Sequence, residues 1–255
     1  VRIENVHATA LGNDRTILVL LPASYASKPA ERYPVIYTHD GQNLYASVVG
    51  GGHVDWNVDG TLDRLAAAGK VREAIVVGVY SNDDRMRELD PLDRGPAYAD
   101  FLIDDVKPMI DRRFRTLRGR DETYVMGSSM GGLISCYLAL THSEVFSAAA
   151  CLSIHVIHPM VINPATDAGK SGAWLRQLEK GVPRHKPVRI YVDHGTAGLD
   201  AQYGPMFQRL VLVLQRDGFV EGRNLEVAVA EGAGHDEAAW AARLERPLVF
   251  LLGRR

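Results

Sequence analysis

The chain has 255 residues, of which 46% are hydrophobic and 24% are charged, and its formal net charge at pH 7 is −2. This composition is ordinary for a soluble globular protein, and the near-neutral charge argues against nucleic acid or an anionic membrane as a partner. No apolar run approaches the roughly 20 residues that a membrane-spanning helix requires. The chain starts at Val1 instead of Met, so we expect a processed or trimmed amino terminus, and both a cytoplasmic and a secreted location stay open.

The amino-terminal residues predict a hairpin at the edge of a sheet. Residues 1–8 and 16–21 have strand patterns, and Gly12, Asn13 and Asp14 supply a turn between them, so the two strands should pair in antiparallel fashion. Short apolar runs farther along the chain predict six more strands. These runs are residues 35–38, 75–79, 123–126, 148–152, 188–192 and 225–229.

Helical patterns separate most of these strands. Residues 98–114, for example, repeat Phe101, Leu102, Val106 and Ile110 at helical spacing. The predicted helices are residues 58–68, 98–114, 130–140, 202–217 and 236–252. Strands that alternate with helices are typical of an α/β fold with a mainly parallel, eight-stranded sheet covered on both faces. We find no repeat and no long linker, so residues 1–255 are expected to form a single domain.

The strongest chemical motif lies between the fifth predicted strand and the helix that follows it. Residues 127–131 read GSSMG, which is a G-x-S-x-G motif centred on Ser129. Ligands on parallel sheets bind beyond the carboxyl ends of the strands, and a serine at this turn is typical of a hydrolase nucleophile. The bare motif is weak, and its alternative is a glycine-rich turn that only packs the helix on the sheet. The strand before the motif and the helix after it favour the nucleophile.

A serine nucleophile needs a base, for which histidine is the usual residue. His235 lies after the last predicted strand and before the last helix, where the base belongs when the order along the chain is serine, acid, histidine. The alternative for His235 is a surface histidine that caps this helix. His39 ends the third strand but precedes Ser129, whereas His155 follows the sixth strand and is a candidate to line the pocket.

The acid that orients the base is expected after the seventh strand, where two aspartates lie. Asp193 ends the strand itself, and Asp200 lies in the following loop, beyond a glycine that lets the chain turn back over the site. We favour Asp200 as the acid and keep Asp193 as the alternative. A structural explanation for Asp200 is that it caps the helix predicted from Gln202.

Two other features have simpler explanations than a functional site. Cys136 and Cys151 lie in apolar surroundings, which predicts buried free thiols, with a bridge between them as the alternative. The loop at residues 83–90 is rich in charge, but its charges alternate in sign, so a solvated loop is favoured over a metal site. The sequence therefore implies no metal and no organic cofactor.

Four segments together resemble a known family. They are HDGQNLY at residues 39–45, GSSMGG at residues 127–132, HGTAGLD at residues 194–200 and GAGHDEAAW at residues 232–240. In this order and spacing they resemble the "putative esterase" branch of the α/β hydrolases. That branch holds esterase D, enterochelin esterases, mycolyl transferases, and the feruloyl and acetylxylan esterases of carbohydrate esterase family one. The resemblance runs from about residue 15 to residue 252 and implies the α/β-hydrolase fold.

The resemblance also implies roles for individual residues. The family has its triad acid at the position of Asp200, and its oxyanion hole consists of two backbone N–H groups, which here belong to Met130 and Gln42. Gly41 allows the tight turn that would point the Gln42 N–H at the site. The chain has no His-Gly-Gly-Gly run of the lipase type. Such enzymes often have structure that covers the pocket at residues 153–181, so we expect a small cap segment there.

Two residues are candidates for substrate binding. Trp56 could stack on an aromatic acyl group or a sugar, with plain packing as the alternative, and His155 either faces the pocket or packs beside it. The combined hypothesis is a serine carboxylic ester hydrolase with Ser129, Asp200 and His235 as its triad, acting on small-molecule esters with small or aromatic acyl groups. Acyl transfer to a sugar or lipid alcohol is the alternative, and a binding module without catalysis is a third. The oligomeric state stays open.

Overall fold

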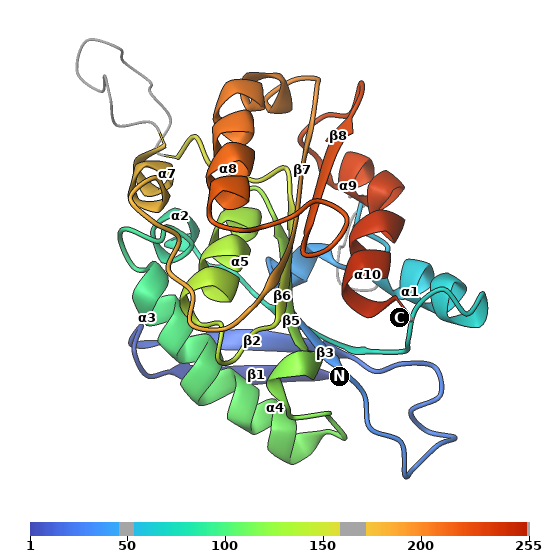
Figure 1. The fold of residues 1–255 in the computed structure, drawn as a ribbon. Coiled ribbons are helices and arrows are strands. Elements are labelled where there is room, and N and C mark those ends of the chain that lie inside the picture. The colour runs from blue at the N-terminus through green and yellow to red at the C-terminus, as the bar shows by residue number, and fades with distance from the viewer. Residues whose placement is uncertain (46–53, 159–171, 254–255) are drawn as a thin grey trace.

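The computed structural model describes residues 1–45, 54–158 and 172–253 of the chain (Figure 1). These residues form one eight-stranded sheet in the order β1-β2-β4-β3-β5-β6-β7-β8. The strands are β1 (Arg2–Ala8), β2 (Asn13–Leu20), β3 (Val35–His39), β4 (Ile75–Val79), β5 (Thr123–Ser128), β6 (Ala148–Leu152), β7 (Arg189–Gly195) and β8 (Leu225–Ala230). Strands β3 to β8 are mutually parallel, and only β1 and β2 join in antiparallel fashion. The predicted α/β fold with a mainly parallel sheet is therefore confirmed.

The predicted edge hairpin is present. β1 pairs with β2 through Ile3 opposite Ile17, with an irregularity between Ile3 and Val6 that includes Asn5 at a φ of 55°. β2 then pairs with β4, so the hairpin attaches to the parallel part of the sheet through a central strand. β2 begins at Asn13, earlier than the sequence pattern suggested, because the turn is confined to the residues before it.

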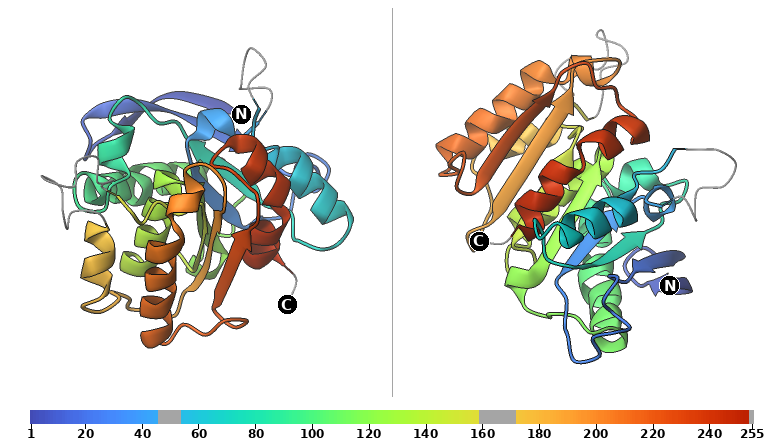
Figure 2. Two further views of the ribbon diagram at one scale, coloured as in Figure 1. Left: turned by 90° about the horizontal axis from the view of Figure 1, so that it is seen from above. Right: turned by 90° about the vertical axis from the view of Figure 1, so that its right-hand side faces the viewer.

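Helices cover both faces of the sheet (Figure 2). One face carries α3, α4, α5, α7 and α8, and the other carries α1, α9 and α10. Their bounds are α1 (Val58–Ala67), α3 (Gly95–Asp100), α4 (Lys107–Arg113), α5 (Met130–Thr141), α7 (Ala173–Leu178), α8 (Gly204–Arg216), α9 (Glu237–Arg243) and α10 (Glu245–Leu252). The strands β3, β4, β5 and β6 are buried along their whole length because both of their faces are covered.

Three helical regions differ from the sequence prediction. The expected helix at residues 98–114 runs through α3, a π-helical segment η2 (Phe101–Val106) and α4. Pro108 lies in the first turn of α4 and has no N–H for a bond to the preceding turn, so a wider turn there is physically reasonable. The expected helix at residues 236–252 is divided at Leu244, and Pro247 lies in the first turn of the second part. A short helix, α2 (Arg85–Glu88), forms in the charged loop where none was expected.

The remaining predictions concern the two cysteines, membrane-spanning helices and the domain organisation. Cys136 and Cys151 are buried free thiols, as predicted. Among the described residues, no helix combines the length and the apolar character that crossing a bilayer would require. The single domain and the cap at residues 153–181 stay predictions, because residues 159–171 of that segment lie outside the described residues.

His39 connects β3 to the helices above it. Its Nδ1 lies 2.7 Å from the hydroxyl of Tyr98, and its Nε2 lies 3.1 Å from Oγ of Ser135. Ser135 donates its own proton to the carbonyl of Gly131, so Nε2 of His39 carries the proton in this arrangement and Nδ1 accepts from Tyr98. Burial lowers the pKa of His39 to about 4, so the ring is neutral at physiological pH.

A buried ion pair joins the hairpin to α2. The guanidinium of Arg15 on β2 contacts both carboxylate oxygens of Glu88, and both side chains are 2% exposed. Asn13 adds a hydrogen bond to the same carboxylate. Removing one member of such a pair leaves the other charge buried without a partner, which is strongly destabilising.

We expect Glu88→Gln to lower the free energy of unfolding by about 3–5 kcal/mol, because the Arg15 charge would stay buried without its counterion. Urea unfolding at neutral pH measures this loss. Glu245→Gln is the matched control, since Glu245 pairs with Lys70 and Arg64 at the surface, where an ion pair contributes little, and its loss should be far smaller. Equal losses in the two variants would contradict the assignment.

The depressed pKa of His39 predicts an acid-sensitive contribution to stability. An unfolded histidine binds its proton near pH 6.5, whereas folded His39 binds it near pH 4, so stability is lost as the pH falls through this range. We expect urea midpoints to show that the wild type loses up to about 3 kcal/mol more between these pH values than His39→Gln does. The same urea series on His7→Gln, which changes an exposed histidine, is the matched control.

Candidate active site

Ser129 occupies a strained turn between β5 and α5. Its φ of 56° and ψ of −124° are unusual for a residue with a side chain. Three backbone hydrogen bonds hold this conformation. The Ser129 N–H donates to the Leu152 carbonyl at 3.0 Å, and the Ser129 carbonyl accepts from Leu133 at 3.0 Å and from His155 at 3.2 Å. Such over-determined strain is common where a side chain must be presented to a reactant.

Glycine at two positions of the motif allows this turn. A Cβ atom at Gly127 would lie 2.5 Å from the backbone of Gly131, so a side chain there would push the strand and the helix apart. A Cβ atom at Gly132 would lie 3.0 Å from the Leu152 carbonyl, which accepts the Ser129 N–H. The close crossing of β5 and α5 therefore depends on these small residues.

Asp200 and His235 are in direct contact. The Nδ1 atom of His235 lies 2.5 Å from Oδ1 of Asp200, and the carboxylate is fully buried. The other oxygen, Oδ2, accepts the Gly195 N–H at 2.6 Å and a hydrogen bond from Ser153 at 2.5 Å. Burial alone would raise the pKa of Asp200, but the hydrogen bonds from His235, Ser153 and Gly195 outweigh it and hold the pKa below its usual range.

The loop that carries His235 is fixed by its contact with the end of β7. A Cβ atom at Gly195 would clash with the carbonyl of Ala233, and the same carbonyl accepts the Ala197 N–H at 3.0 Å. The imidazole of His235 also packs edge-on against the indole of Trp240, with 5.1 Å between the ring centroids. The histidine is thus oriented by packing as well as by the carboxylate.

Asp193, the alternative acid, lies elsewhere. Its carboxylate is fully buried and pairs with Arg243, at 3.1 Å between Nε and Oδ2. It also accepts a hydrogen bond from the Tyr191 hydroxyl at 2.8 Å. Of the two aspartates, only Asp200 contacts the imidazole of His235.

Tyr203 lies among the three candidate triad residues and was not singled out by the sequence. Its hydroxyl lies 2.5 Å from Nδ1 of His155 and 3.5 Å from Nδ1 of His235. Burial and the Asp200 carboxylate raise the pKa of Tyr203, whereas a hydrogen bond from Ser129 lowers it. Tyr203 is therefore a neutral phenol that touches both the serine and the two histidines.

The described residues show no hydrogen bond between the Ser129 hydroxyl and His235. The Tyr203 hydroxyl lies 3.5 Å from Nδ1 of His235, and Ser129 is close enough to lower the pKa of Tyr203. In structures without substrate, catalytic hydrogen bonds are commonly long and tighten when substrate binds. The geometry thus gathers Ser129, Asp200 and His235 at one end of the sheet.

The two candidate oxyanion donors lie on adjacent turns. Met130 is the first residue of α5, and Gln42 is the central residue of the short helix η1 (Gly41–Asn43) after β3. The Gln42 side chain is tied to Ser81 through a hydrogen bond of 2.6 Å from Nε2 to Oγ. A Cβ atom at Gly41 would lie 2.6 Å from the Gly78 backbone, so a glycine is required where this loop approaches β4.

The remaining candidates lie beside the triad cluster. His155 is buried, and burial together with His158 and His235 lowers its pKa to about 4. Its ring centroid is 6.5 Å from that of His235. Trp56 is only 3% exposed and packs against Trp240 at a centroid separation of 5.5 Å, so it lies behind the indole that supports His235. A role of Trp56 in substrate binding stays a prediction.

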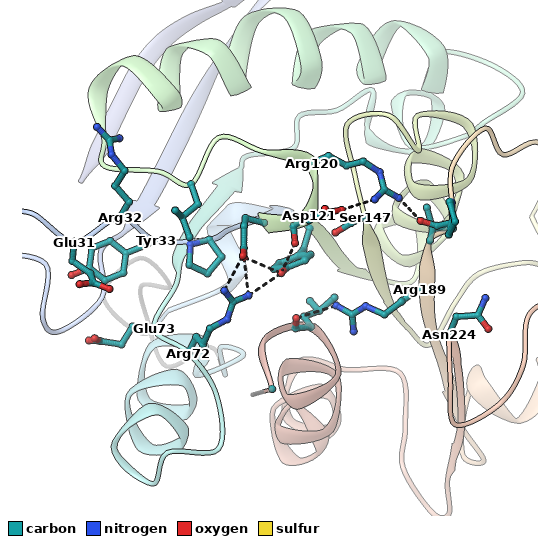
Figure 3. Close-up of a pocket in the computed structure, with 18 of the residues that line it drawn as sticks. Glu31, Arg32, Tyr33, Arg72, Glu73, Arg120, Asp121, Ser147, Arg189 and Asn224 are labelled. Atoms are coloured by element: carbon teal, nitrogen blue, oxygen red, sulfur yellow. Dashed lines mark hydrogen bonds and ion pairs between the residues drawn. The ribbon is translucent and has the colours of Figure 1, made fainter. Parts of the chain in front are cut away.

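A site outside this cluster could be a metal-binding group or a groove. Within residues 1–45, 54–158 and 172–253, no group of three or more histidine, cysteine or acidic side chains is arranged to hold a metal ion. A groove of about 1180 Å³ lies at the amino-terminal end of the parallel strands (Figure 3). Its charges are largely paired with one another, as in the 2.7 Å contact between Arg72 and Glu122. None of the candidate site residues lines this groove.

Two curated proteins are similar to this chain in sequence. The chain is 30% identical over 245 residues to an endo-1,4-beta-xylanase/feruloyl esterase of Xylanibacter ruminicola, a match that covers 92% of this chain and 29% of that protein. Over 139 residues it is 25% identical to the uncharacterized protein YjcH of Bacillus subtilis. The chain thus spans about a third and about half of the lengths of these two curated relatives.

Two solved structures share the fold. A ferulic acid esterase superposes with a TM-score of 0.72 at 20% identity, with 99% of this chain and 97% of that chain covered. The enterobactin esterase of Shigella flexneri superposes with a TM-score of 0.78 at 19% identity, with 98% of this chain and 58% of that chain covered. The family model described as "Putative esterase" matches residues 8–251, and the chain therefore belongs to this esterase family of α/β hydrolases.

Proposed function

We propose that the chain is a serine carboxylic ester hydrolase in which Ser129 is the nucleophile, His235 the base and Asp200 the acid. The observation that carries the proposal is the 2.5 Å contact between Asp200 and Nδ1 of His235 at the same end of the sheet as the strained Ser129. A histidine whose Nδ1 proton is held by a carboxylate presents the Nε2 lone pair as the proton acceptor. Membership of an esterase family supports the same reaction class.

The proposed reaction has two steps. Ser129 directs its hydroxyl toward Nε2 of His235, which accepts the proton while Oγ attacks the ester carbonyl. The C–O bond to the alcohol then breaks, and the imidazolium returns its proton to the departing alcohol. A water molecule, activated by the same histidine, adds to the acyl-enzyme and releases the carboxylic acid and the free serine.

Backbone groups would stabilise the negative charge that develops on the carbonyl oxygen. The Met130 N–H lies at the amino end of α5, where no residue of the same helix can accept it. The second donor is the Gln42 N–H, in a turn held in place by the contact between Gly41 and β4. One such donor typically contributes about 2.7–4 kcal/mol of transition-state stabilisation.

The surroundings of the triad favour an uncharged acyl group of small or aromatic type. His155 and Tyr203 are both neutral at physiological pH and lie in contact with each other, so these two side chains offer no charge to an anionic acyl group. The Xylanibacter ruminicola relative carries feruloyl esterase in its name, which supports an aromatic acyl group. Acyl transfer to an alcohol acceptor uses the same acyl-enzyme and differs only in what replaces water.

We expect Ser129→Ala to lower the hydrolysis of p-nitrophenyl acetate by at least about 1000-fold, because no nucleophile replaces Oγ. The variant should also lose covalent labelling by a fluorophosphonate probe. Ser128→Ala, which changes the neighbouring serine at the end of β5, should keep the labelling. A Ser129→Ala enzyme with the wild-type rate would disprove the assignment, and an unlabelled, inactive wild type would favour a binding module.

A panel of acetyl, butyryl, octanoyl and feruloyl esters tests the acyl preference. We expect kcat/KM for the acetyl or feruloyl ester to exceed that for the octanoyl ester by at least about tenfold, since a pocket rejects groups that it cannot enclose.

Product analysis with added glucose or glycerol separates hydrolysis from transfer. If transfer exceeds hydrolysis in dilute acceptor, the protein is an acyltransferase and the name hydrolase is wrong.

A further inference from the structure

Behind Asp200 lies a buried set of side chains that the proposed reaction does not use. We call Asp193, Arg243, Ser153 and Trp240 the Arg243 network. Its members come from β7, α9 and the turn after β6, so it joins three elements beneath the candidate acid. Asp193 and Asp200 are both fully buried, and the Arg243 side chain between them is 13% exposed.

Hydrogen-bond directions in this network follow from the donor types. The Oγ atom of Ser153 lies 2.9 Å from Nε1 of Trp240 and 2.7 Å from Nη2 of Arg243. An indole N–H and a guanidinium N–H can only donate, so both lone pairs of Ser153 Oγ are occupied. The single hydroxyl proton of Ser153 must therefore go to Oδ2 of Asp200, at 2.5 Å.

Asp193 holds the network in place. Its carboxylate accepts from Arg243 at 3.1 and 3.3 Å and from the Ser153 backbone N–H at 2.7 Å. That backbone bond fixes Ser153 at a φ of 40°, a conformation that a serine rarely adopts. The same guanidinium lies 3.8 Å from Oδ2 of Asp200, so one positive charge is shared between two buried carboxylates.

All partners of Asp200 can be assigned to one of its two oxygens. Among the described residues, Oδ2 receives Ser153, the Gly195 N–H and the charge of Arg243, whereas Oδ1 receives His235 alone. Saturating Oδ2 in this way fixes the rotation of the carboxylate and directs Oδ1 at the imidazole. The charged and titratable groups around Asp200 are His235, Arg243, Tyr203 and His155, together with Asp193 on the other side of Arg243.

We propose that Arg243 and Ser153 are positioning residues for the Asp200–His235 pair, with Asp193 as the anchor of Arg243. This inference rests on the proposed function, because it takes Asp200 as the triad acid. The positive charge of Arg243, passed on through the polarised Ser153 hydroxyl, favours an ionised Asp200 and opposes protonation of the pair. Asp193, which was the alternative acid on sequence alone, instead pairs with Arg243 in this network.

The test is the pH profile of kcat/KM for p-nitrophenyl acetate from about pH 5 to pH 9, whose acid limb reports the titration of the coupled pair in the free enzyme. Arg243→Met removes a positive charge, so the pair should bind its proton more tightly and the acid limb should move to higher pH by about one pH unit. Ser153→Ala should move it in the same direction. Arg243→Lys keeps the charge and should restore the wild-type limb.

Arg246→Met is the matched control, because Arg246 lies on the neighbouring helix α10 and pairs with Glu226 at the surface. It should leave both the rate and the acid limb unchanged. If Arg243→Met and Ser153→Ala lose activity while their acid limbs stay at the wild-type pH, the network only supports the fold and the proposal is overturned. Should Arg243→Met fail to fold, an unmoved limb in Ser153→Ala overturns it as well.

Asp200→Asn separates failure of this inference from failure of the proposed function. An amide at position 200 should cost about 10⁴-fold in kcat, as expected for the wrong histidine tautomer. If Asp200→Asn and Ser129→Ala both keep their activity, the triad itself is wrong. If both lose it and the Arg243 variants show an unmoved limb, the triad stands and only the role of the Arg243 network fails.

Discussion

The arrangement at the site depends on keeping one carboxylate, Asp200, charged in the protein interior. An ionised carboxylate without water is costly unless hydrogen bonds and an opposite charge compensate it. Here the compensation comes from β7, from the turn after β6, from α9 and from the loop before α9. Because each partner lies on a different element, the carboxylate can be satisfied only when all of these elements have reached their final positions.

Close backbone approaches bring those elements together. Glycines at positions 127 and 195 allow contacts that any side chain would block, one between β5 and α5 and the other between β7 and the His235 loop. The neutral ring of His39 adds a polar link between β3 and α5 that needs no charge compensation. The turns that carry Ser129 and Gln42 are consequently fixed from beneath by packing and from the side by hydrogen bonds.

Much of this arrangement could be predicted from the sequence, for identifiable reasons. Strand patterns and the G-x-S-x-G motif are local, so the position of Ser129 at the end of β5 follows from residues close to it in the chain. The same holds for the loops that carry Asp200 and His235. The choice between Asp193 and Asp200 was open on sequence alone, because the contact with His235 depends on how β7 and β8 are placed side by side.

Other features depend on tertiary contacts that leave no local pattern. Tyr203 and Arg243 lie in ordinary helical sequence, and their relation to the site comes from neighbours 48 and 90 residues away in the chain. The packing of Trp56 against Trp240 is another such tertiary contact, and a role of Trp56 in substrate binding stays a prediction. The spacing of apolar residues in an ordinary helix likewise does not predict the π-helical segment before Pro108.

The outermost strand of the parallel sheet has a further consequence. Among the strands that the structure describes, β8 pairs with β7 alone, and the loop that follows β8 carries His235, whereas Ser129 follows the central strand β5. Edge elements open locally at a lower free energy than the interior of a sheet. Separation of β8 from β7 would therefore withdraw the imidazole that we propose as the base and leave the turn of the proposed nucleophile intact. On heating, activity should accordingly fall reversibly while the central strands remain folded. Loss of activity would then report local opening of β8 instead of global unfolding.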